Sequence, residues 1–424
     1  MINLDKFLLD LKRLVKINSA ESSPTENAPF GKGVSLALSE FCAIATELGF
    51  TPVNHQGYIA EITVGNGEEV GVIGHLDVVP EGDIKNWNYP PFDLTVKDQI
   101  VYGRGVSDDK GPLLICLYAL KELVDSGYKF NKTIRLFAGT NEETGWGDIE
   151  YYQKIGSFPE YGFSPDGGFP VSYAEKGVMP TTFFLPKLKL FSEIQGGNAI
   201  NAVCDYAFAV PTFIPTKQEL DKFGLFYKDG KILSYGVTAH GSTPEKGKNA
   251  LKPLFEYLLY KGEKVKKVLD GLFYDKYNIT KLTCEQGSVT ISPNVIKTNQ
   301  QVIELVCDVR VPYPFTQTDI TQKFDLIAVD YTTDLKHPPM HTAKDGWFVG
   351  ALMDAYKKVT GEKDAKPVSM GGSTFARAFK YGCAFGAGFP QDSEVAHQPN
   401  EHVSIENINK CYQIYKNAFI NLIK

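Results

Sequence analysis

Apolar residues recur at helical spacing at the start of the chain. They include Leu4, Phe7, Leu8, Leu11, Leu14 and Val15. These positions fall on one face of a helix, which predicts an amphipathic helix over residues 4–16. The same periodicity returns further along the chain. It predicts helices over 33–49, where Gly49 is the stop signal, and over 113–124, 249–267, 347–358 and 405–422.

Short apolar runs rich in β-branched and aromatic residues lie between these helices. They predict strands over 58–64, 70–77 and 133–140. The segments 20–31 and 84–99 are polar or rich in Pro, Trp and Asp, which is typical of loops. Because strands and helices alternate, the pattern predicts an α/β sheet flanked by helices. Functional residues of such a sheet gather at the carboxyl ends of its strands.

The pattern of predicted secondary structure changes between residues 178 and 335. This stretch holds alternating strand-like segments such as TTFFL, KLKLFSEI and QVIELVCDVRV. Beyond it the helical pattern returns, so we interpret the stretch as a separate α+β domain inserted into the first. We therefore expect a discontinuous first domain of residues 1–177 and 336–424, and an inserted domain of residues 178–335.

The composition narrows the classes of function. The chain has 424 residues, of which 43% are hydrophobic and 22% charged, as in ordinary soluble globular proteins. Its net charge of −6 gives no reason to expect nucleic acid or a membrane surface as a partner. The N-terminus lacks the apolar core and cleavage site of a signal peptide, and no apolar run is long enough to span a bilayer.

The seven cysteines are scattered along the chain, and none forms a C-x-x-C pair. They resemble the reduced, mostly buried thiols of a cytoplasmic protein. Without a cysteine cluster, any metal site must be built from His, Asp and Glu. The chain has only seven histidines, so each can be considered in turn.

The stretch GVIGHLDVV, residues 71–79, places His75 and Asp77 in an apolar run of strand length. Side chains two apart on a strand point to the same face, so an imidazole and a carboxylate would lie side by side where solvation is poor. A metal bound by His75, with Asp77 fixing the tautomer, would satisfy both groups. The alternative is a strand end that emerges into solvent at Pro80, and for this pair alone that interpretation is preferred.

Two further acidic pairs follow predicted strands. Asp108 and Asp109 lie at a loop-to-helix junction, where they are either helix caps or, through Asp108, a bridge between two metals. Considered alone, the cap is favoured. Glu142 and Glu143 follow an apolar strand instead of lying on a solvated helix. One of them could bind a metal while the other acts as general base for a bound water.

Asp166 lies in a Pro-Asp-Gly turn and His397 precedes a Pro-Asn turn, and each is an ordinary loop residue if considered singly. His402 is an alternative to His397, but it lies closer to the final helix. Taken together, two histidines and three or four carboxylates follow strand or loop ends of one sheet. This set suits two divalent ions, most naturally zinc, that share one aspartate. The chemistry is then hydrolysis of an amide or a phosphate ester.

Five motifs occur in a recognisable order: GHLDVVPEGD, GRGVSDDKGP, GTNEETGWGD, SPDGGFP and VAHQPNE. They resemble the metal-site motifs of the M20 metallopeptidases over residues 70–405, and the GxxDDKGP and SPDxxFP forms are most similar to the PepV-type dipeptidases. The resemblance implies a zinc-peptidase-like catalytic domain, with a mixed sheet flanked by helices, and an inserted α+β lid domain. It also implies two divalent metal ions per chain, zinc first, with manganese or cobalt as alternatives.

The resemblance also implies roles for residues at the matching positions. One metal would be bound by His75 and Asp166, and the other by Glu143 and His397. Asp108 would bridge the two ions. The catalytic residues outside this ligand set would be Asp77, which orients His75, and Glu142, the general base that takes a proton from the attacking water.

The inserted domain carries matching segments. GGNAINAVCD resembles a family segment that places Asn201 at the substrate, although Cys204 stands where proline is usual. TAHGSTPEKGKNA resembles the lid histidine motif, in which the catalytic residue His240 donates to the oxyanion. Arg310 in CDVRVP would pair with the substrate's C-terminal carboxylate. The backbone amides that would also receive this carboxylate belong to Gly371, Gly372 and Ser373.

These features predict a cytoplasmic, metal-dependent dipeptidase that acts on unblocked dipeptides as a monomer instead of a lid-mediated homodimer. A close alternative is another M20 amide hydrolase, namely an aminoacylase, a desuccinylase or a carboxypeptidase. Two other classes stay open. A non-catalytic, metal-stabilised binding protein would have no reason to keep both Glu142 and Glu143, and a two-metal phosphohydrolase would use similar ligands.

Overall fold

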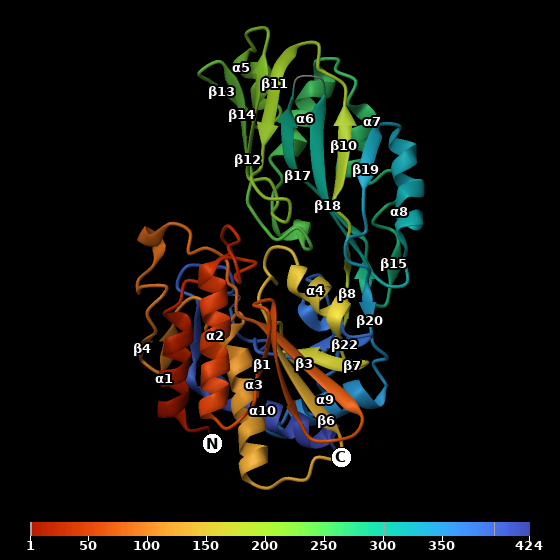
Figure 1. Ribbon diagram of the computed structural model, residues 1–424. Coiled ribbons are helices and arrows are strands. Elements are labelled where there is room, and N and C mark those ends of the chain that lie inside the picture. The colour runs from red at the N-terminus through yellow and green to blue at the C-terminus, as the bar shows by residue number, and fades with distance from the viewer. Residues whose placement is uncertain (1, 300–301, 394) are drawn as a thin grey trace. The chain divides into compact units, whose positions relative to one another are not determined.

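The computed structural model describes residues 2–299, 302–393 and 395–424, and the chain divides into two compact units (Figure 1). Unit 1 comprises Met1–Tyr173, His341–Val368 and Thr374–Lys424. Unit 2 comprises Ala174–Met340 and Ser369–Ser373. The second unit is therefore an insertion in the chain of the first.

The segment 369–373 differs from the sequence expectation, which put it in the first domain. The backbone carbonyl of Met370 accepts a hydrogen bond from the Lys176 amide at 3.1 Å, and Ser369 Oγ donates to the Gln286 carbonyl at 3.3 Å. These contacts attach the segment to unit 2. Sequence periodicity could not have shown this, because the partners lie far away along the chain.

A mixed sheet forms the centre of unit 1, in the strand order β1-β2-β6-β3-β7-β22-β8-β20 with β21 beside β8. The chain passes from one unit to the other within its strands β8, β20 and β21. Strand β3 runs parallel to both β6 and β7, and β7 is parallel to β22, whereas β1, β2 and β6 pair antiparallel. The bounds are β1 (Val53–His55), β2 (Ile59–Val64), β3 (Glu69–His75), β6 (Thr133–Gly139), β7 (Tyr161–Ser164), β8 (Ser172–Glu175), β20 (Met340–His341), β21 (Val368–Met370) and β22 (Tyr381–Ala384). Strand β6 is buried along its whole length and β3 along all but its first residue, as near-continuous apolar runs predict.

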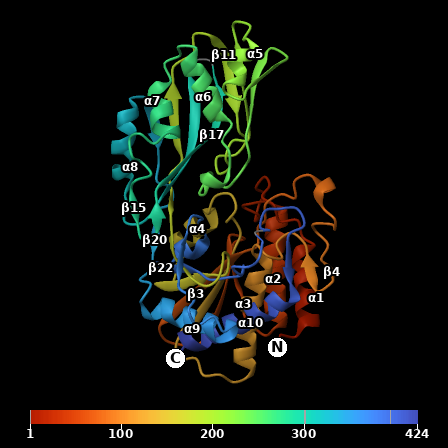
Figure 2. The ribbon, with the colours of Figure 1, turned by 180° about the vertical axis from the view of Figure 1, so that it is seen from behind.

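Helices cover both faces of this sheet. On one face, Ile73 and Phe137 pack with Ile149 of α4 (Gly147–Ile155) and with Phe375 of the 3₁₀ turn η5 (Phe375–Ala378). On the other face, α3 (Lys110–Asp125) lies against β3 and α10 (Ile405–Leu422). Figure 2 shows α10 beside α9 (Trp347–Thr360). Helices α1 (Leu4–Val15) and α2 (Lys32–Glu47) pack together. The predicted α/β sheet flanked by helices is confirmed.

A small second sheet, β23-β5-β4, lies in unit 1. Its strands are β4 (Thr95–Lys97), β5 (Ile100–Tyr102) and β23 (His402–Ser404). The sequence predicted a loop over 84–99, and this was wrong for β4. Asp98 and Gln99 adopt left-handed φ values of 51° and 63°, which close a tight hairpin that a polar composition conceals. The pairing of β23 with β5 brings residues before 402 alongside residues after 102.

Unit 2 is built on an antiparallel sheet in the order β13-β14-β12-β11-β17-β18-β10-β19, with β9 beside β18. Helix α6 (Leu251–Tyr260) contributes Leu254 and Phe255 to its core. The predicted helix over 249–267 is shorter because Gly262 takes a left-handed φ of 86°, which ends the helix. The strands are β9 (Gly177–Val178), β10 (Thr181–Leu185), β11 (Phe191–Gly196), β12 (Tyr206–Pro211), β13 (Phe226–Lys228), β14 (Lys231–Tyr235), β17 (Thr290–Thr298), β18 (Ile303–Val311) and β19 (Asp330–Thr333).

Shorter elements complete unit 2. They are α5 (Lys217–Asp221), η2 (Pro244–Lys246), α7 (Lys266–Val268), the π-helical turn η3 (Leu269–Phe273), β15 (Thr283–Cys284), β16 (Gly287–Ser288), α8 (Gln317–Phe324) and η4 (Asp325–Ile327). In unit 1 the remaining element is the 3₁₀ turn η1 (Ile84–Asn86).

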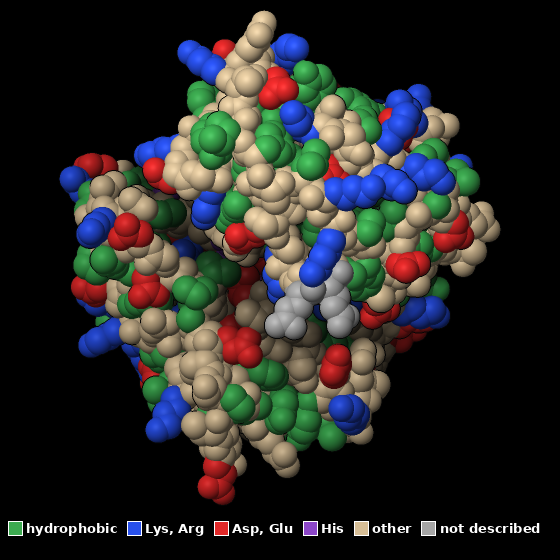
Figure 3. All heavy atoms as spheres, turned by 90° about the horizontal axis from the view of Figure 1, so that it is seen from above, with side chains coloured by type: hydrophobic (Ala, Val, Ile, Leu, Met, Phe, Trp, Pro, Cys, Tyr) green, Lys and Arg blue, Asp and Glu red, His purple; other side chains and the backbone are tan. Residues whose placement is uncertain are grey.

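The surface carries charges of both signs. On the face that Figure 3 shows, Lys and Arg side chains are interspersed with Asp and Glu and with apolar groups, and no single basic patch stands out. Within the part of the chain that the structure describes, no helix is both long enough and apolar enough to cross a bilayer.

Candidate metal centre and active site

His75 is the last residue of β3, and Asp77 lies beyond the end of the strand. The prediction that both residues belong to one strand was therefore wrong, because the backbone leaves the sheet after His75. The two side chains still meet. Asp77 Oδ1 lies 3.4 Å from His75 Nδ1, and the Asp77 backbone oxygen lies 3.0 Å from the same nitrogen. These contacts fix one ring nitrogen and leave Nε2 directed at other groups.

Asp108, in the loop before α3, lies between two imidazoles. Its Oδ1 is 3.0 Å from His75 Nε2, and its Oδ2 is 3.0 Å from His397 Nε2. Asp166 Oδ2 lies 3.7 Å from His75 Nε2, and Glu143 Oε2 lies 3.1 Å from His397 Nε2. All five predicted metal ligands therefore meet at the carboxyl ends of the unit 1 strands and in the loops that follow.

Asp77 also positions the two glutamates that follow β6. Its Oδ1 accepts a hydrogen bond from the Glu142 amide at 3.2 Å, and its Oδ2 accepts one from the Glu143 amide at 3.0 Å. One buried carboxylate thereby fixes the loop that carries both glutamates. Two overlapping groups have ligand atoms within 4.8 Å of one another: His75, Glu142 and Asp166, and His75, Asp108 and Glu143.

The charged groups of the cluster shift the pKa values of their neighbours. Burial, followed by repulsion from neighbouring carboxylates, raises the pKa of three carboxyls above their usual range. These belong to Glu142, Glu143 and Asp166. Burial also acts to raise the pKa of Asp108, but hydrogen bonds from His397 and His75 outweigh it and lower that pKa. In return, Asp108 and then Glu143 raise the pKa of His397 to about 11.

The donor set fits divalent cations. It consists of imidazole nitrogens and carboxylate oxygens, which are ligands of zinc and of the harder manganese. Carboxylates outnumber imidazoles, and the raised pKa of His397 shows that the cluster favours an added positive charge. Asp108 presents one oxygen to each histidine, which is the arrangement that a carboxylate shared by two ions requires.

Asp148 supports the backbone that leads into the glutamate loop. It is fully buried, and its Oδ2 accepts hydrogen bonds from the amides of Thr140 at 2.6 Å and Asn141 at 3.0 Å. Burial raises the pKa of this carboxyl to about 7, although these amides oppose the shift. The folded protein therefore binds this proton more tightly than the unfolded chain, in which an Asp pKa is about 3.9.

We expect the Asp148 carboxyl to lower the stability of the folded protein as the pH rises. Its contribution is fully present below about pH 4 and is lost as the pH rises through about 7. In metal-free protein, the free energy of unfolding relative to Asp148→Asn should therefore decline by roughly 2–4 kcal/mol across this window. Denaturant titrations at several pH values measure the difference. The exposed Asp364→Asn is the matched control, and parallel curves for wild type and Asp148→Asn would contradict the expectation.

The other predicted residues lie in unit 2, where several are linked to one another. Arg310 of β18 binds Asp308 side-on, with Nε 2.7 Å from Oδ1 and Nη2 2.9 Å from Oδ2. Its Nη1 donates to the Gly371 carbonyl at 3.2 Å. His240 Nδ1 lies 2.6 Å from Ser242 Oγ, and a Cβ on Gly371 would approach Ser242 Cβ to 2.7 Å. The glycine loop, the histidine loop and Arg310 therefore form one cluster.

Asn201 joins this cluster through its backbone. Its carbonyl accepts a hydrogen bond from the Gly241 amide at 2.7 Å, next to His240. Gly372 and Ser373 continue the glycine loop. The hydroxyl of Ser373 is buried without a hydrogen-bond partner among the described residues.

Sequence reasoning missed some of the supporting residues. They are Asp148, Asp308 and Glu401, together with Asn294, whose amide donates to the Ile200 carbonyl at 2.6 Å. The first three belong to the motifs GTNEETGWGD and VAHQPNE or to the CDVRVP segment. Their position inside those motifs was the one sign in the sequence that these residues support the site. Neither the residue type nor the spacing distinguishes a carboxylate that accepts backbone hydrogen bonds from one that is exposed to solvent.

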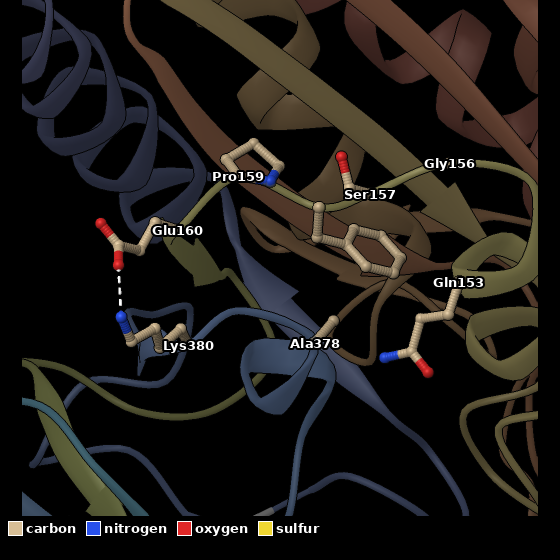
Figure 4. Close-up of a pocket in the computed structure, with 8 residues that line it drawn as sticks. Gln153, Gly156, Ser157, Pro159, Glu160, Ala378 and Lys380 are labelled. Carbon is tan, nitrogen blue, oxygen red and sulfur yellow. Dashed lines mark hydrogen bonds and ion pairs between the residues drawn. The ribbon is translucent and has the colours of Figure 1, made fainter.

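A separate hollow on unit 1 lies near the start of β7 (Figure 4). It is lined by Gln153, Gly156, Ser157, Phe158, Pro159, Glu160, Ala378 and Lys380. Glu160 and Lys380 neutralise each other across it, with Nζ 2.6 Å from Oε1. None of the predicted site residues lines this hollow, so we assign it no part in the chemistry.

Comparisons with known proteins agree with this picture. Residues 71–421 match peptidase family M20/M25/M40. The chain is 30% identical to the Beta-Ala-Xaa dipeptidase of Lactobacillus delbrueckii subsp. lactis, an alignment that covers 99% of this chain and 96% of that protein. It is also 30% identical to YtjP of Bacillus subtilis (strain 168), with 99% of this chain and 98% of that protein covered.

Solved structures share the fold. Human carnosine dipeptidase 1 aligns with a TM-score of 0.60 at 16% identity, covering 99% of this chain and 96% of that one. A tripeptidase from Staphylococcus aureus subsp. aureus mu50 aligns with a TM-score of 0.63 at 15% identity, and both chains are covered completely. At these identities the likeness concerns the fold.

Proposed function

We propose that this chain, which belongs to peptidase family M20/M25/M40, is a metal-dependent dipeptidase that hydrolyses the peptide bond of unblocked dipeptides. The observation that carries the proposal is Asp108, whose two oxygens each lie 3.0 Å from a different histidine, with Glu142 placed beside them by Asp77. The 30% identity to a Beta-Ala-Xaa dipeptidase over nearly the whole chain supports the substrate class.

In this proposal His75 and Asp166 would hold one divalent ion, Glu143 and His397 would hold the other, and Asp108 would be shared. Zinc is the first candidate and manganese or cobalt the alternatives, because borderline ions accept both imidazole and carboxylate. When bound, such a pair polarises the scissile carbonyl and lowers the pKa of water.

Glu142 is the general base of the proposed reaction. It accepts a proton from the water whose oxygen forms the new bond to the carbonyl carbon. The C–N bond then breaks, and Glu142 returns the proton to the leaving amine nitrogen. A carboxyl that both takes and gives a proton near neutral pH needs a pKa above the ordinary range, and burial and then Asp166 raise the pKa of Glu142 in this direction.

The substrate contacts of unit 2 form the second part of the proposal. Arg310 would bind the C-terminal carboxylate, which also meets the amides of the glycine loop Gly371–Ser373. Asp308 accepts from Nε and Nη2 of the guanidinium and the Gly371 carbonyl accepts from Nη1, so one N–H group on each of Nη1 and Nη2 would be offered to substrate. His240 would donate a hydrogen bond to the oxyanion, and Asn201 would contact the substrate beside it.

Rates on a matched set of substrates test the proposed function. We expect turnover of a free dipeptide and much slower turnover of its N-acetyl derivative, of its C-terminal amide and of the corresponding tripeptide. The amide loses the charge that Arg310 recognises, so its KM should rise most. Preference for the N-acyl compound would favour an aminoacylase or desuccinylase, and preference for longer peptides a carboxypeptidase. Turnover of p-nitrophenyl phosphate without dipeptide turnover would favour a phosphohydrolase.

We expect His240→Ala to lower kcat by about 10²–10³-fold, because a preformed donor to the oxyanion is lost. Metal content and unfolding temperature should stay at wild-type values, since His240 lies in unit 2, apart in the chain from the proposed ligands. Steady-state kinetics and metal analysis measure both quantities. His55→Ala, a histidine outside the proposed site, serves as the control. A wild-type kcat for His240→Ala would remove this residue from the active site.

We also propose a cytoplasmic monomer. Among the residues that the structure describes, no disulfide joins any of the seven cysteines, which is usual in a reducing compartment. Light scattering after size-exclusion chromatography tests the oligomeric state, and a stable dimer would overturn that part of the proposal.

A further inference from the structure

Glu401 has no assigned role in the reaction described above, yet it is completely buried in unit 1. It directly precedes β23, and its backbone carbonyl accepts a hydrogen bond from the Gly103 amide at 3.1 Å. Burying a carboxylate is costly unless its oxygens are hydrogen-bonded. The identity of its partners therefore indicates why this position carries a glutamate.

The Glu401 carboxylate accepts hydrogen bonds from three amides of the loop that ends in Asp108. The Gly105 amide lies 3.0 Å from Oε1 and 3.1 Å from Oε2. The amides of Ser107 and Asp108 lie 2.8 Å and 3.1 Å from Oε1. The donors converge because Gly105 takes a left-handed φ of 89°, which lets neighbouring amides point at one anion.

Arg104 completes the arrangement. Its Nη1 donates to Glu401 Oε2 at 2.9 Å, and both side chains are buried. The guanidinium also donates to the backbone carbonyls of Gln398 at 3.4 Å and Pro80 at 3.3 Å. Gln398 directly follows His397, so the ion pair contacts the backbone of the histidine loop as well as that of the Asp108 loop.

The histidine loop is held on its other side too. Asn400 Oδ1 accepts a hydrogen bond from the Asn88 amide at 2.6 Å, and its Nδ2 donates to the Asn86 carbonyl at 2.9 Å. His397 and Asn400 both adopt left-handed φ values, 62° and 63°. The short segment from His397 to Glu401 is therefore fixed at both ends, and Glu401 is its attachment to the Asp108 loop.

We propose that Glu401 is a positioning residue that holds the Asp108 loop at a fixed distance from His397 and thereby sets the affinity of the site for divalent ions. The inference rests on the metal centre of the proposed function. The backbone amide of Asp108 donates a hydrogen bond to the Glu401 carboxylate, while the side-chain carboxylate of Asp108 lies against His397. Glu401 therefore fixes the backbone of the same residue whose side chain contacts His397. Residues that orient metal ligands commonly contribute 10–100-fold to affinity.

The test measures metal affinity directly. Metal-free Glu401→Gln is titrated with Zn²⁺ alone, and separately with Mn²⁺ alone, in competition with a chromogenic chelator. The amide keeps the size of the side chain but replaces one acceptor oxygen with a donor that faces backbone amides. We expect affinity for the ions to fall by about 10–100-fold. KM for a dipeptide at saturating metal should stay close to the wild-type value, because Glu401 does not touch substrate in the proposal.

Glu263→Gln is the matched control. Glu263 is also buried and accepts two backbone hydrogen bonds, from Lys189 at 2.8 Å and Leu190 at 2.7 Å, but it belongs to unit 2, whereas the proposed ligands belong to unit 1. Both variants should lower the unfolding temperature of the metal-free protein. Only Glu401→Gln should change metal affinity. A folded Glu401→Gln with wild-type affinity would overturn the inference.

A second variant covers the case in which Glu401→Gln does not fold. Arg104→Lys keeps a positive charge near Oε2 but removes the contacts to the Gln398 and Pro80 carbonyls, and it should weaken Zn²⁺ binding by a smaller factor. Unchanged affinity in Arg104→Lys would then overturn the inference. A chain that binds both ions but hydrolyses no dipeptide would instead refute the proposed function and leave the role of Glu401 standing.

Discussion

Dialysis of the protein against a chelator is expected to abolish hydrolysis of a free dipeptide, and added Zn²⁺ or Mn²⁺ is expected to restore it. The reason lies in the composition of the cluster. Asp108, Glu143 and Asp166 meet His75 and His397, and none of these groups is a nucleophile able to attack a peptide carbonyl at useful rates. In the proposed reaction, the attack would depend on water activated by bound ions.

The measurement is steady-state hydrolysis before dialysis, after dialysis and during stepwise addition of each ion. Recovery should level off near two ions per chain, because Asp108 is proposed to be shared. Circular dichroism of the dialysed protein provides the control, since unfolding would also remove activity. Full activity in folded protein shown by elemental analysis to contain no metal would end the two-metal proposal.

Glu142→Gln is expected to lower kcat by about 10²–10⁴-fold while leaving both ions bound. Glutamine has nearly the same shape, so the Asp77 contact to the backbone amide of residue 142 should persist. What it loses is the ability to accept a proton from water and return it to the amine. KM should change little, because the substitution leaves the proposed substrate contacts in place.

Two comparisons make this result specific. Glu150→Gln, on the exposed surface of α4, should retain wild-type kcat. Glu143→Gln should lose metal as well as activity, because Glu143 lies 3.1 Å from His397 and is a proposed ligand. If Glu142→Gln kept a substantial part of wild-type kcat with two ions bound, a different residue would have to be the base.

Sequence reasoning predicted most regular elements well, and its failures have physical causes. The helices over 4–16 and 405–422 are present within one residue of the expected ends, because a long apolar stripe at helical spacing is a local property. Strand β4 was missed since its hairpin depends on two residues with left-handed φ, Asp98 and Gln99. The helix over 249–267 ended early at a glycine whose backbone conformation no periodicity reveals.

In the candidate site, too, the sequence predicted some features and only the structure shows others. The order of the motifs was enough to make His75, Asp108 and His397 candidates. Their convergence depends on β3 running parallel to β6 and β7, which directs the loops after these strands to one edge of the sheet. Asp77 was expected beside His75 on the strand, but it acts from beyond the strand end, where it also holds two backbone amides.

The sequence by itself determined most of the helical and extended segments, the change of pattern that indicates an inserted domain, and which side chains have the chemistry to bind divalent ions. These properties follow from residue type and from spacing between near neighbours. Only the tertiary structure decided that Glu401 accepts the backbone amides before Asp108, and that residues 369–373 join unit 2. Both depend on hydrogen bonds between positions hundreds of residues or many elements apart, whose partners no local pattern of hydrophobic and polar residues can specify.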